Sequence, residues 1–336
     1  MTPRLRTPRV RTPRIRTPHP YAVSLRVPLP RGLRAHPLAP YVLTAALLVL
    51  AACDSAAPGP DPGPDPTPDP VAGERIVFVS ERDGDSEIYT MNVDGTGLVQ
   101  LTDNDARDGS PEWSPDGTRI AFASDRHGNA EIYVMDADGS DVRRLTQHGA
   151  TDGAPTWSPD GARIAFTSDR DGDFEIFVMR ADGSSVVQLT TNDDHDVDPA
   201  WTPSGPEIAF SSDRDGDFEI FVMNANGLGQ TQITAHRDHD IGPAWSPDGS
   251  RIAFTRDGDG TLDVVVADAD GSNDWKPVPG GSVSRPVWSP DGTRIAYESQ
   301  RDGRVDVFAV ALDGSGETNL TDHPGHNYQA DWVDLP

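Results

Sequence analysis

The sequence predicts an all-β protein whose folded part is one six-bladed β-propeller. Two observations predict this fold. A tryptophan returns every 43 or 44 residues, and the two ends of the repeating region are complementary parts of one repeat. A repeat of this length that holds four short strands is typical of a propeller blade. The recurring tryptophans are Trp113, Trp157, Trp201, Trp245, Trp288 and Trp332.

Residues 1–52 differ in composition from the rest of the chain. They contain nine arginines and no acidic residue, and their near-repeat TPRLRTPRVRTPRIRTP has too many prolines to build a core. The apolar run Tyr41 to Leu50 is short for a membrane span and typical of the apolar region of a signal peptide. We therefore expect residues 1–52 to be a cleaved signal peptide.

The apolar run ends in Leu50-Ala-Ala-Cys53, which resembles the lipobox of bacterial lipoproteins. The resemblance implies that Cys53, the only cysteine, is acylated and becomes the first residue of the mature chain. A free thiol after an ordinary signal peptide is the alternative. Residues 53–73 alternate Pro with Asp or Gly and are expected to form an extended tether. We expect a protein of the bacterial cell envelope, held to the membrane only by lipid, with its folded part outside the cytoplasm.

The mature chain is strongly acidic. Residues 1–52 carry nine of the 28 Lys and Arg residues and none of the 54 acids, so their removal shifts the net charge from −26 to −35. This charge excludes a nucleic-acid role and favours cations or cationic partners. With a single cysteine the chain forms no internal disulfide, so packing and ring closure must stabilise it.

Each repeat reads as four strands with recognisable turns. The first strand runs through Trp, and the Ser-Pro-Asp-Gly that follows is a hairpin turn. Arg-Ile-Ala-Phe forms the second strand, and a Ser-Asp-Arg-Asp-Gly-Asp loop leads to the third strand, Glu-Ile-Phe-Val-Met. Ala-Asp-Gly-Ser then turns into a short fourth strand that ends in Leu-Thr. The Trp and Met that recur in the blades are expected in the core between them.

The two ends of the repeating region predict how the ring closes. Residues 74–80, ERIVFVS, match the second strand of a blade, whereas residues 328–334, YQADWVD, match the first. The C-terminal strand should therefore complete the opening blade and leave no unpaired blade edge. This assigns residues 74–336 to the propeller.

The motifs WSPDG, IAF, SDRDG, EIYVM and ADGS, in this order and spacing, resemble the TolB-type propeller repeat over residues 74–336. The resemblance implies a six-bladed propeller of a family whose members bind envelope proteins, peptides or sugars, or regulate an attached peptidase. TolB itself carries an α/β domain before its propeller, where this chain has the tether.

The antiparallel strand order separates two faces of the ring. The Ser-Asp-Arg loops and the loops between blades lie on one, which we call the loop face. The Pro-Asp-Gly and Ala-Asp-Gly turns lie on the other, the turn face, which we interpret as structural. All histidines after Cys53 belong to the loop face, so we place any ligand site there. They are His127, His148, His195, His236, His239, His323 and His326.

The candidate ligand-binding residues occupy two positions of the repeat, both on the N-terminal side of the repeated Trp. Asp108, Asp152, Asp196 and Asp240 stand five residues before it, and His195, His239 and His326 stand six before it. One interpretation is an acidic ring at the mouth of the central channel that binds a cation or a cationic ligand. The alternative is a solvated acidic loop that follows the repeat.

Two loops of the loop face resemble calcium-binding loops, because hard cations need closely spaced carboxylates. They contain Asp169, Asp171 and Asp173, and Asp213, Asp215 and Asp217. Both lack the full calcium-loop order. The favoured interpretation is therefore structural, with the first Asp as a cap, the Arg paired to it and the Gly in a turn. Histidine pairs such as His236 and His239 have a zinc-like spacing but no further fixed ligand.

The sequence favours a binding or scaffold module over an enzyme. The expected partner is an envelope protein or peptide that contacts the His/Asp-rich loop face, and we expect a monomer without a cofactor. No Gly-x-Ser-x-Gly motif or appended hydrolase portion is present. The alternative function is a glycan-directed hydrolase or lyase on the same face, since two carboxylates at a suitable separation would suffice.

Overall fold

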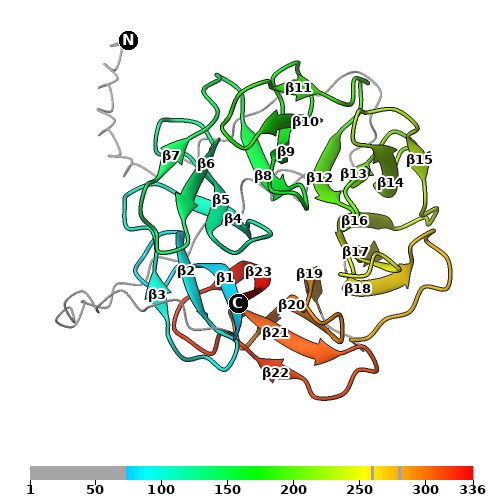
Figure 1. Ribbon diagram of the computed structural model, residues 1–336. Coiled ribbons are helices and arrows are strands. Elements are labelled where there is room, and N and C mark those ends of the chain that lie inside the picture. Colours follow the sequence, from blue (N-terminus) through cyan, green and yellow to red (C-terminus); the bar gives the residue numbers. More distant parts are fainter. Residues whose placement is uncertain (1–72, 259–260, 279–281, 336) are drawn as a thin grey trace, which may run out of the picture. The chain divides into compact units, whose positions relative to one another are not determined.

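The computed structural model describes residues 73–258, 261–278 and 282–335. All regular elements in these ranges are β-strands, and they form six sheets arranged around a centre, as Figure 1 shows. The predicted six-bladed propeller is confirmed. The signal peptide, Cys53 and all of the tether before Gly73 lie outside the described residues. Within those residues no helix is long and apolar enough to cross a membrane.

The strands of each blade follow in chain order. Blade 1 comprises β1 (Gly73–Ser80), β2 (Glu87–Asn92), β3 (Val99–Gln100) and the last strand, β23 (Asn327–Leu335). Blade 2 comprises β4 (Asp108–Trp113), β5 (Arg119–Ser124), β6 (Glu131–Asp136) and β7 (Arg143–Arg144). Blade 3 comprises β8 (Asp152–Trp157), β9 (Arg163–Ser168), β10 (Glu175–Arg180) and β11 (Val187–Gln188).

The second half of the ring follows the same plan. Blade 4 comprises β12 (Asp196–Trp201), β13 (Glu207–Ser212), β14 (Glu219–Asn224) and β15 (Thr231–Gln232). Blade 5 comprises β16 (His239–Trp245), β17 (Arg251–Gly258) and β18 (Thr261–Asp268). Blade 6 comprises β19 (Val283–Trp288), β20 (Arg294–Arg301), β21 (Arg304–Ala311) and β22 (Thr318–Asn319).

The ring closes through blade 1, where the last strand pairs with the first. β23 lies antiparallel to β1, with Trp332 opposite Ile76 and Asn327 opposite Ser80. Figure 1 shows the red C-terminal strand beside the blue β1. The predicted closure by the C-terminus is confirmed. It gives β1 a partner on each side, because β2 pairs with its other edge.

Blade 5 has three strands and an isolated bridge, a departure from the four strands expected in every repeat. Val266 and Trp275 form the bridge, and no strand continues from it in the described residues. In blade 3 the residue after the outer strand, Leu189, donates its N–H to the Ile176 carbonyl at 2.8 Å. The equivalent residue of blade 5 is Pro277, which has no N–H. The hydrogen bonds between the third strand and an outer strand therefore end at this position.

The hydrophobic core lies between neighbouring blades. Trp157 of blade 3, for example, packs with Ile132 and Val134 of blade 2. Five of the six recurring tryptophans are only 3–6% exposed, and the once-per-blade methionines of blades 1 to 4 are buried. The expectation that these residues form the interblade core is confirmed. Trp245, in blade 5, is half-buried and forms the exception.

Every inner strand contains a bulge whose central residue has a positive φ. These residues are Ser110, Ala154, Asp198, Gly242, Arg285 and Gln329, with φ between 47° and 66°. Only one is a glycine, although a left-handed backbone costs other residues about 1 kcal/mol or more. Several of these residues donate their N–H to a hydroxyl of the preceding blade. For example, Thr255 Oγ1 accepts the Arg285 N–H at 2.9 Å. The bulges thus help to join neighbouring blades.

Candidate functional site

The four candidate aspartates of the loop face lie at the start of inner strands and are 0–1% exposed. Each forms an ion pair with an arginine from the end of the second strand or the loop after it in the same blade. The pairs are Arg126–Asp108 at 2.8 Å, Arg170–Asp152 at 2.9 Å, Arg214–Asp196 at 2.9 Å and Arg256–Asp240 at 2.7 Å. A desolvated carboxylate needs such a partner, because an unpaired buried charge is strongly destabilising.

The pair in blade 3 shows the full arrangement. Arg170 Nη2 donates to both carboxylate oxygens of Asp152 at 2.9 Å, and its Nε donates to Ser168 Oγ at 2.9 Å. Its guanidinium also lies 4.4 Å from the centre of the Phe177 ring. The loop folds back over the blade and carries the arginine to the inner strand. The pair therefore stabilises the blade.

This geometry corrects two details of the sequence interpretation. The four aspartates do not form a ring of solvent-facing acids, because burial and ion pairing occupy their carboxylates; a ligand role for them stays a prediction. The loop arginine also pairs with the inner-strand Asp and not with the first Asp of its own loop. That residue, Asp169 in blade 3, accepts the N–H of Thr151 at 2.6 Å, and Asp213 in blade 4 accepts the N–H of His195 at 2.7 Å.

The three candidate histidines connect neighbouring blades at three of the six junctions. Nδ1 of His195 accepts the Phe174 N–H at 3.2 Å, Nδ1 of His239 accepts the Phe218 N–H at 3.0 Å, and Nδ1 of His326 accepts the Val305 N–H at 3.1 Å. A neutral ring that accepts at Nδ1 carries its hydrogen on Nε2. All three rings are half-buried, so Nε2 is the atom through which each could meet a ligand.

A buried glutamate begins the third strand of blades 1 to 4. In blade 2, Arg144 Nη2 donates to Glu131 Oε1 at 2.7 Å. Burial alone would raise the pKa of Glu131, but hydrogen bonds from Thr146, from the His148 N–H and from Arg144 lower it. The other three glutamates have no arginine partner in the part of the chain that the structure describes, and burial raises their pKa to about 7. They are Glu87, Glu175 and Glu219.

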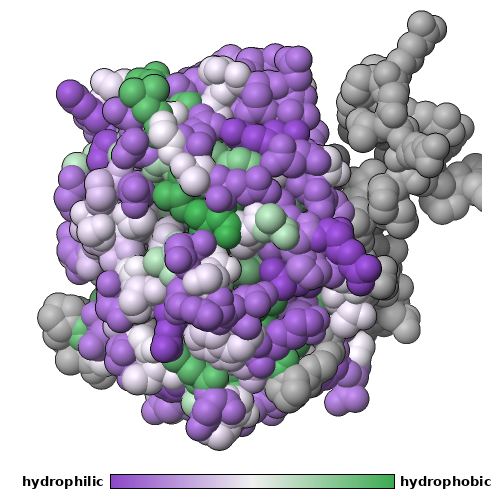
Figure 2. Space-filling view, turned by 90° about the vertical axis from the view of Figure 1, so that its right-hand side faces the viewer, coloured by the Kyte–Doolittle hydropathy of each residue, from purple (hydrophilic) through white to green (hydrophobic). Residues whose placement is uncertain are grey.

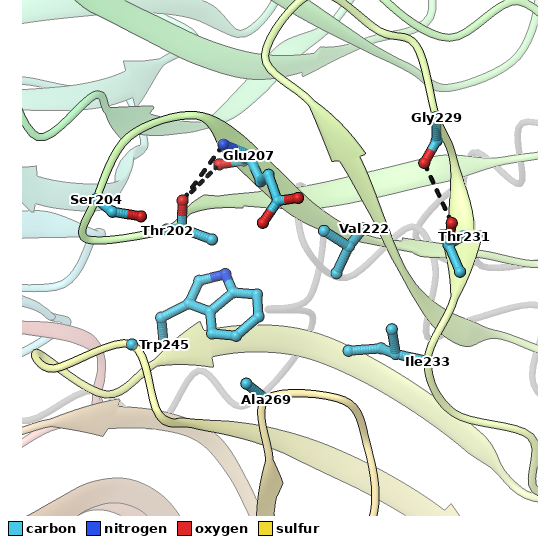
Figure 3. Close-up of a pocket in the computed structure, with 10 residues that line it drawn as sticks. Thr202, Ser204, Glu207, Val222, Gly229, Thr231, Ile233, Trp245 and Ala269 are labelled. Atoms are coloured by element: carbon cyan, nitrogen blue, oxygen red, sulfur yellow. Dashed lines mark hydrogen bonds between the residues drawn. The ribbon is translucent and has the colours of Figure 1, made fainter.

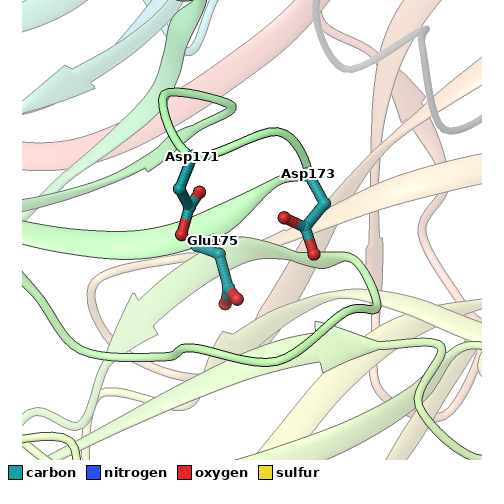
Figure 4. Close-up of side chains that lie close together, drawn as sticks. All are labelled: Asp171, Asp173 and Glu175. Atoms are coloured by element: carbon teal, nitrogen blue, oxygen red, sulfur yellow. The ribbon is translucent and has the colours of Figure 1, made fainter.

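Three carboxylates of blade 3 come together beneath the loop between β9 and β10. One oxygen each of Asp171, Asp173 and Glu175 lies within 4.8 Å of the other two, and Figure 4 shows the two aspartates descending from the loop toward Glu175. Buried Asp173 Oδ2 and Glu175 Oε2 have no hydrogen-bond partner among the described residues. The loop thus gathers two of its predicted calcium ligands. Asp169 is directed elsewhere, and Asp213, Asp215 and Asp217 form no such group in the described ranges.

The structure also contains a groove on the turn face, between blades 4 and 5, that the sequence interpretation missed. Its volume is about 340 Å³, and Figure 3 shows Trp245 facing Glu207, Val222 and Ile233 across it. The remaining lining residues are Thr202, Ser204, Gly229, Thr231, Gly249 and Ala269. Blades 4 and 5 lie on the right of Figure 1, and Figure 2 shows that side as mostly hydrophilic with separate hydrophobic patches.

The sequence does contain a signal for this groove. Glu207 stands where the other five blades have Arg at the start of the second strand, and Leu228 stands where they have Ser or Thr. Ser204 replaces the Asp of the Pro-Asp-Gly turn. These departures concentrate in one repeat, whereas the turn face was interpreted as uniform.

Comparison with known proteins places the chain in a family. The TolB beta propeller domain family matches residues 55–153 and 147–333, which together span most of the chain. The chain belongs to the TolB β-propeller family. A stretch of 48 residues of this TolB-family protein is 50% identical to a TolB homolog of Chlorobaculum tepidum and covers 14% of this chain and 11% of that protein.

Solved TolB structures agree with this assignment. The crystal structure of TolB from Acinetobacter baumannii is 25% identical, with a TM-score of 0.69 over 77% of this chain and 66% of that one. Putative TolB from Agrobacterium tumefaciens shares the fold at 20% identity, with a TM-score of 0.62 over 79% of this chain and 99% of that one. The TolB-family chain described here therefore spans about two thirds of the Acinetobacter protein and a small part of the Chlorobaculum protein.

Proposed function

We propose that this protein is a binding module that engages an envelope protein or peptide through the loop face. One observation carries the proposal. The loop face consists of a repeated internal frame of Asp–Arg pairs, on which interblade loops of different sequence are exposed. Exposed side chains on these loops include Asp103, His148, Asp193, Asp194, Arg237 and Asp322. Variable polar loops on a rigid scaffold are typical of recognition surfaces.

The geometry gives less support to a glycan hydrolase or lyase. Such an enzyme needs two carboxylates that both reach the sugar. The acids gathered around Glu175 have no arginine partner among the described residues, but Glu175 itself is fully buried and out of reach of a polymer. The four inner-strand aspartates are held in ion pairs. The enzymatic function therefore remains the alternative.

Crosslinking and pulldown from membranes of producing cells test the binding proposal. The informative variants are His148→Ala, Asp193→Ala/Asp194→Ala and Arg237→Ala, because these exposed side chains can change without breaking a buried pair. We expect these variants to lose partners that the wild type captures, while Asp182→Ser on the turn face keeps them. Unchanged partners in all loop-face variants would refute the proposal. Turnover of a glycan panel that the same variants abolish would favour the alternative.

The proposed site of action is the bacterial cell envelope, with Cys53 as the lipid anchor. The proposal rests on the Leu-Ala-Ala-Cys motif. Labelling with a palmitate analogue should mark the wild-type protein and fail to mark Cys53→Ser. Label in both proteins would contradict the assignment of the anchor to Cys53.

A cation site is a second candidate function, favoured by the carboxylate cluster of blade 3. Two calcium–oxygen bonds of about 2.4 Å span about 4.8 Å, the separation within which the three oxygens lie. In blade 2, Arg144 neutralises the charge of Glu131. The equivalent position of blade 3 is occupied by the neutral Gln188. We propose that a divalent cation such as Ca²⁺ supplies the missing charge next to Asp171, Asp173 and Glu175.

Thermal melting with calcium or with a chelator tests this second proposal. We expect Ca²⁺ to raise the Tm of the wild type and to have no effect on Asp173→Asn/Glu175→Gln. Glu131→Gln is the matched control, because its blade already contains an arginine, and it should keep the calcium response. A wild-type Tm that is indifferent to calcium and chelator would dismiss the site.

A further inference from the structure

Three blade junctions share one arrangement of an arginine and a tryptophan. The arginine that begins the second strand of one blade lies over the indole ring of the next blade. The distances from guanidinium to ring centre are 4.6 Å for Arg119 and Trp157, 4.5 Å for Arg163 and Trp201, and 4.6 Å for Arg294 and Trp332. This separation is characteristic of a cation–π contact. At these junctions the chain supplies its own cation to the tryptophan.

The junction between blades 4 and 5 lacks this cation. Glu207 occupies the position of the arginine, and Trp245 is half-buried where its three counterparts are 3–6% exposed. Val222 of the same junction is also half-buried, whereas the equivalent Val134 is 3% exposed. The groove at this junction has a volume of about 340 Å³, as Figure 3 shows. The equivalent junction of blades 2 and 3 has a groove of about 300 Å³ that Arg119 lines. The junction of blades 4 and 5 therefore differs in its lining, where a carboxylate and an uncovered tryptophan replace the guanidinium.

The groove combines three features that suit a cationic side chain. Trp245 offers an aromatic ring to it, and the exposed Glu207 forms no ion pair with another described residue. Leu228, beside the groove-lining Gly229, is 67% exposed and provides an apolar contact at the rim. A carboxylate next to an indole ring is a site for a cation that can also stack.

We propose that this groove binds an arginine side chain of a partner protein. The other junctions show which group fits there, because in three of them a guanidinium covers the equivalent tryptophan. Arginine is favoured over lysine, since its planar group can stack on the indole while it pairs with Glu207 in a bidentate manner. The acidic protein also attracts cationic segments. This site lies on the turn face and is independent of the loop-face function proposed above.

The first arm of the test measures peptide binding by isothermal titration calorimetry with the whole mature protein. The probe is an acetylated and amidated pentapeptide, Ala-Leu-Arg-Leu-Ala, and its counterpart has citrulline in place of arginine. Citrulline has nearly the shape of arginine but no charge. We expect the arginine peptide to bind at least about tenfold more tightly than the citrulline peptide, and more weakly as salt rises. Equal affinities, or no binding at millimolar concentration, would overturn the proposal.

The second arm uses variants of the groove. Glu207→Arg restores the residue of the other blades, so its own guanidinium should cover Trp245 and abolish peptide binding while the protein stays folded. Trp245→Ala should weaken binding about tenfold. Asp334→Arg is the matched control, because it makes the same charge change at an exposed position of blade 1 and should leave binding nearly unchanged.

The outcomes separate this site from the loop-face proposal. Binding by Glu207→Arg at the wild-type affinity would refute the groove site, even if Trp245→Ala failed to fold. Equal weakening in Glu207→Arg and Asp334→Arg would show a general charge effect and would also refute it. The loop-face variant His148→Ala should bind the arginine peptide like the wild type. Failure of the groove site therefore leaves the membrane pulldown as an independent test of the loop face.

Discussion

The buried ion pair of Asp152 and Arg170 illustrates how single side chains stabilise this propeller. Asp152 is fully buried, and Arg170 satisfies both of its carboxylate oxygens while it lies against Phe177. Equivalent pairs occur in blades 2, 4 and 5. The acidic composition of the loop face therefore has a structural cause in part, because some of its acids are internal partners of arginines.

Arg170→Ala should destabilise the protein by about 3–5 kcal/mol, because it leaves the charge of Asp152 buried without a partner. Urea unfolding followed by tryptophan fluorescence measures the change. Arg143→Ala removes a pair whose side chains are 59% and 57% exposed, and it should cost less than about 0.5 kcal/mol. A loss of similar size in both variants would contradict a structural role for the buried pair.

The stability of the protein should depend on pH through Glu175. Burial raises its pKa to about 7, above its ordinary value of 4.5. The folded state then keeps a proton that the unfolded state loses, so this group's contribution to stability falls as pH rises from about 4.5 to 7. Glu175→Gln, which has no charge to bury, should be more stable than the wild type by about 1–2 kcal/mol at pH 8 without divalent cations. The difference should vanish near pH 4.5.

Glu131→Gln is the control and should have the opposite sign. The pKa of Glu131 is lowered, so its charged form stabilises the fold above pH 4.5. Its replacement should destabilise the protein at pH 8, since Arg144 then loses its partner. Urea midpoints from pH 4.5 to 8 measure both variants. A Glu175→Gln protein less stable than the wild type at pH 8 would contradict the proposed cost of the buried charge.

The interaction partner of each individual side chain was the least predictable feature of the site. The sequence places Arg170 beside Asp169, and that neighbour was its expected partner, but the folded loop carries the arginine to Asp152, 18 residues earlier. Sequence spacing does not determine how a loop folds back over its sheet. The histidines were expected in loops, but His239 begins strand β16. The Nδ1 bonds of His195, His239 and His326 to the preceding blade depend on the ring geometry and have no signal in the sequence.

At the scale of strands and blades, the pattern of the repeat predicted most elements. Turn residues and the recurring Trp located the strands, because hairpin turns and blade cores require particular residues. The inner-strand bulges were not predictable, since residues such as Ala154 and Arg285 give no signal for a positive φ. The short sheet of blade 5 did have a signal, Pro277, at a position that donates an N–H in other blades.

Glu207→Arg should stabilise the junction of blades 4 and 5. The new guanidinium can lie over Trp245 as Arg163 lies over Trp201, at 4.5 Å. A cation–π contact at an exposed site contributes about 0.5–1 kcal/mol. Chemical denaturation should show a gain of that size, with Asp334→Arg unchanged within about 0.5 kcal/mol. A destabilised Glu207→Arg protein would show that blade 4 cannot accept the arginine.

For the whole molecule, ring closure is the feature on which stability depends most. Deletion of Tyr328–Pro336 removes nearly all of β23 together with Trp332, which is buried between blades 6 and 1. Loss of a buried tryptophan alone costs about 3–5 kcal/mol, a large share of the 5–15 kcal/mol typical of a folded domain. We expect a much lower Tm, or no cooperative melting. Removal of nine residues between 54 and 72 is the control and should leave the Tm unchanged.

The overall architecture was predictable because three independent signals agreed: tryptophan spacing, turn chemistry and the complementary ends of the repeating region. The comparisons support the same family, which the repeat motifs had indicated. The identity of a partner does not follow from these signals, because a fold can serve many functions.

The pairing of β23 with β1 also constrains when the ring can close during folding. β1 is the first strand of the described residues, but the strand that covers its inner edge, β23, is the last of them. Until β23 docks, blade 1 has an open edge that could pair with another chain. The strand pairing with the greatest sequence separation among the described residues is therefore the one that ends the period in which a folding chain is prone to aggregate.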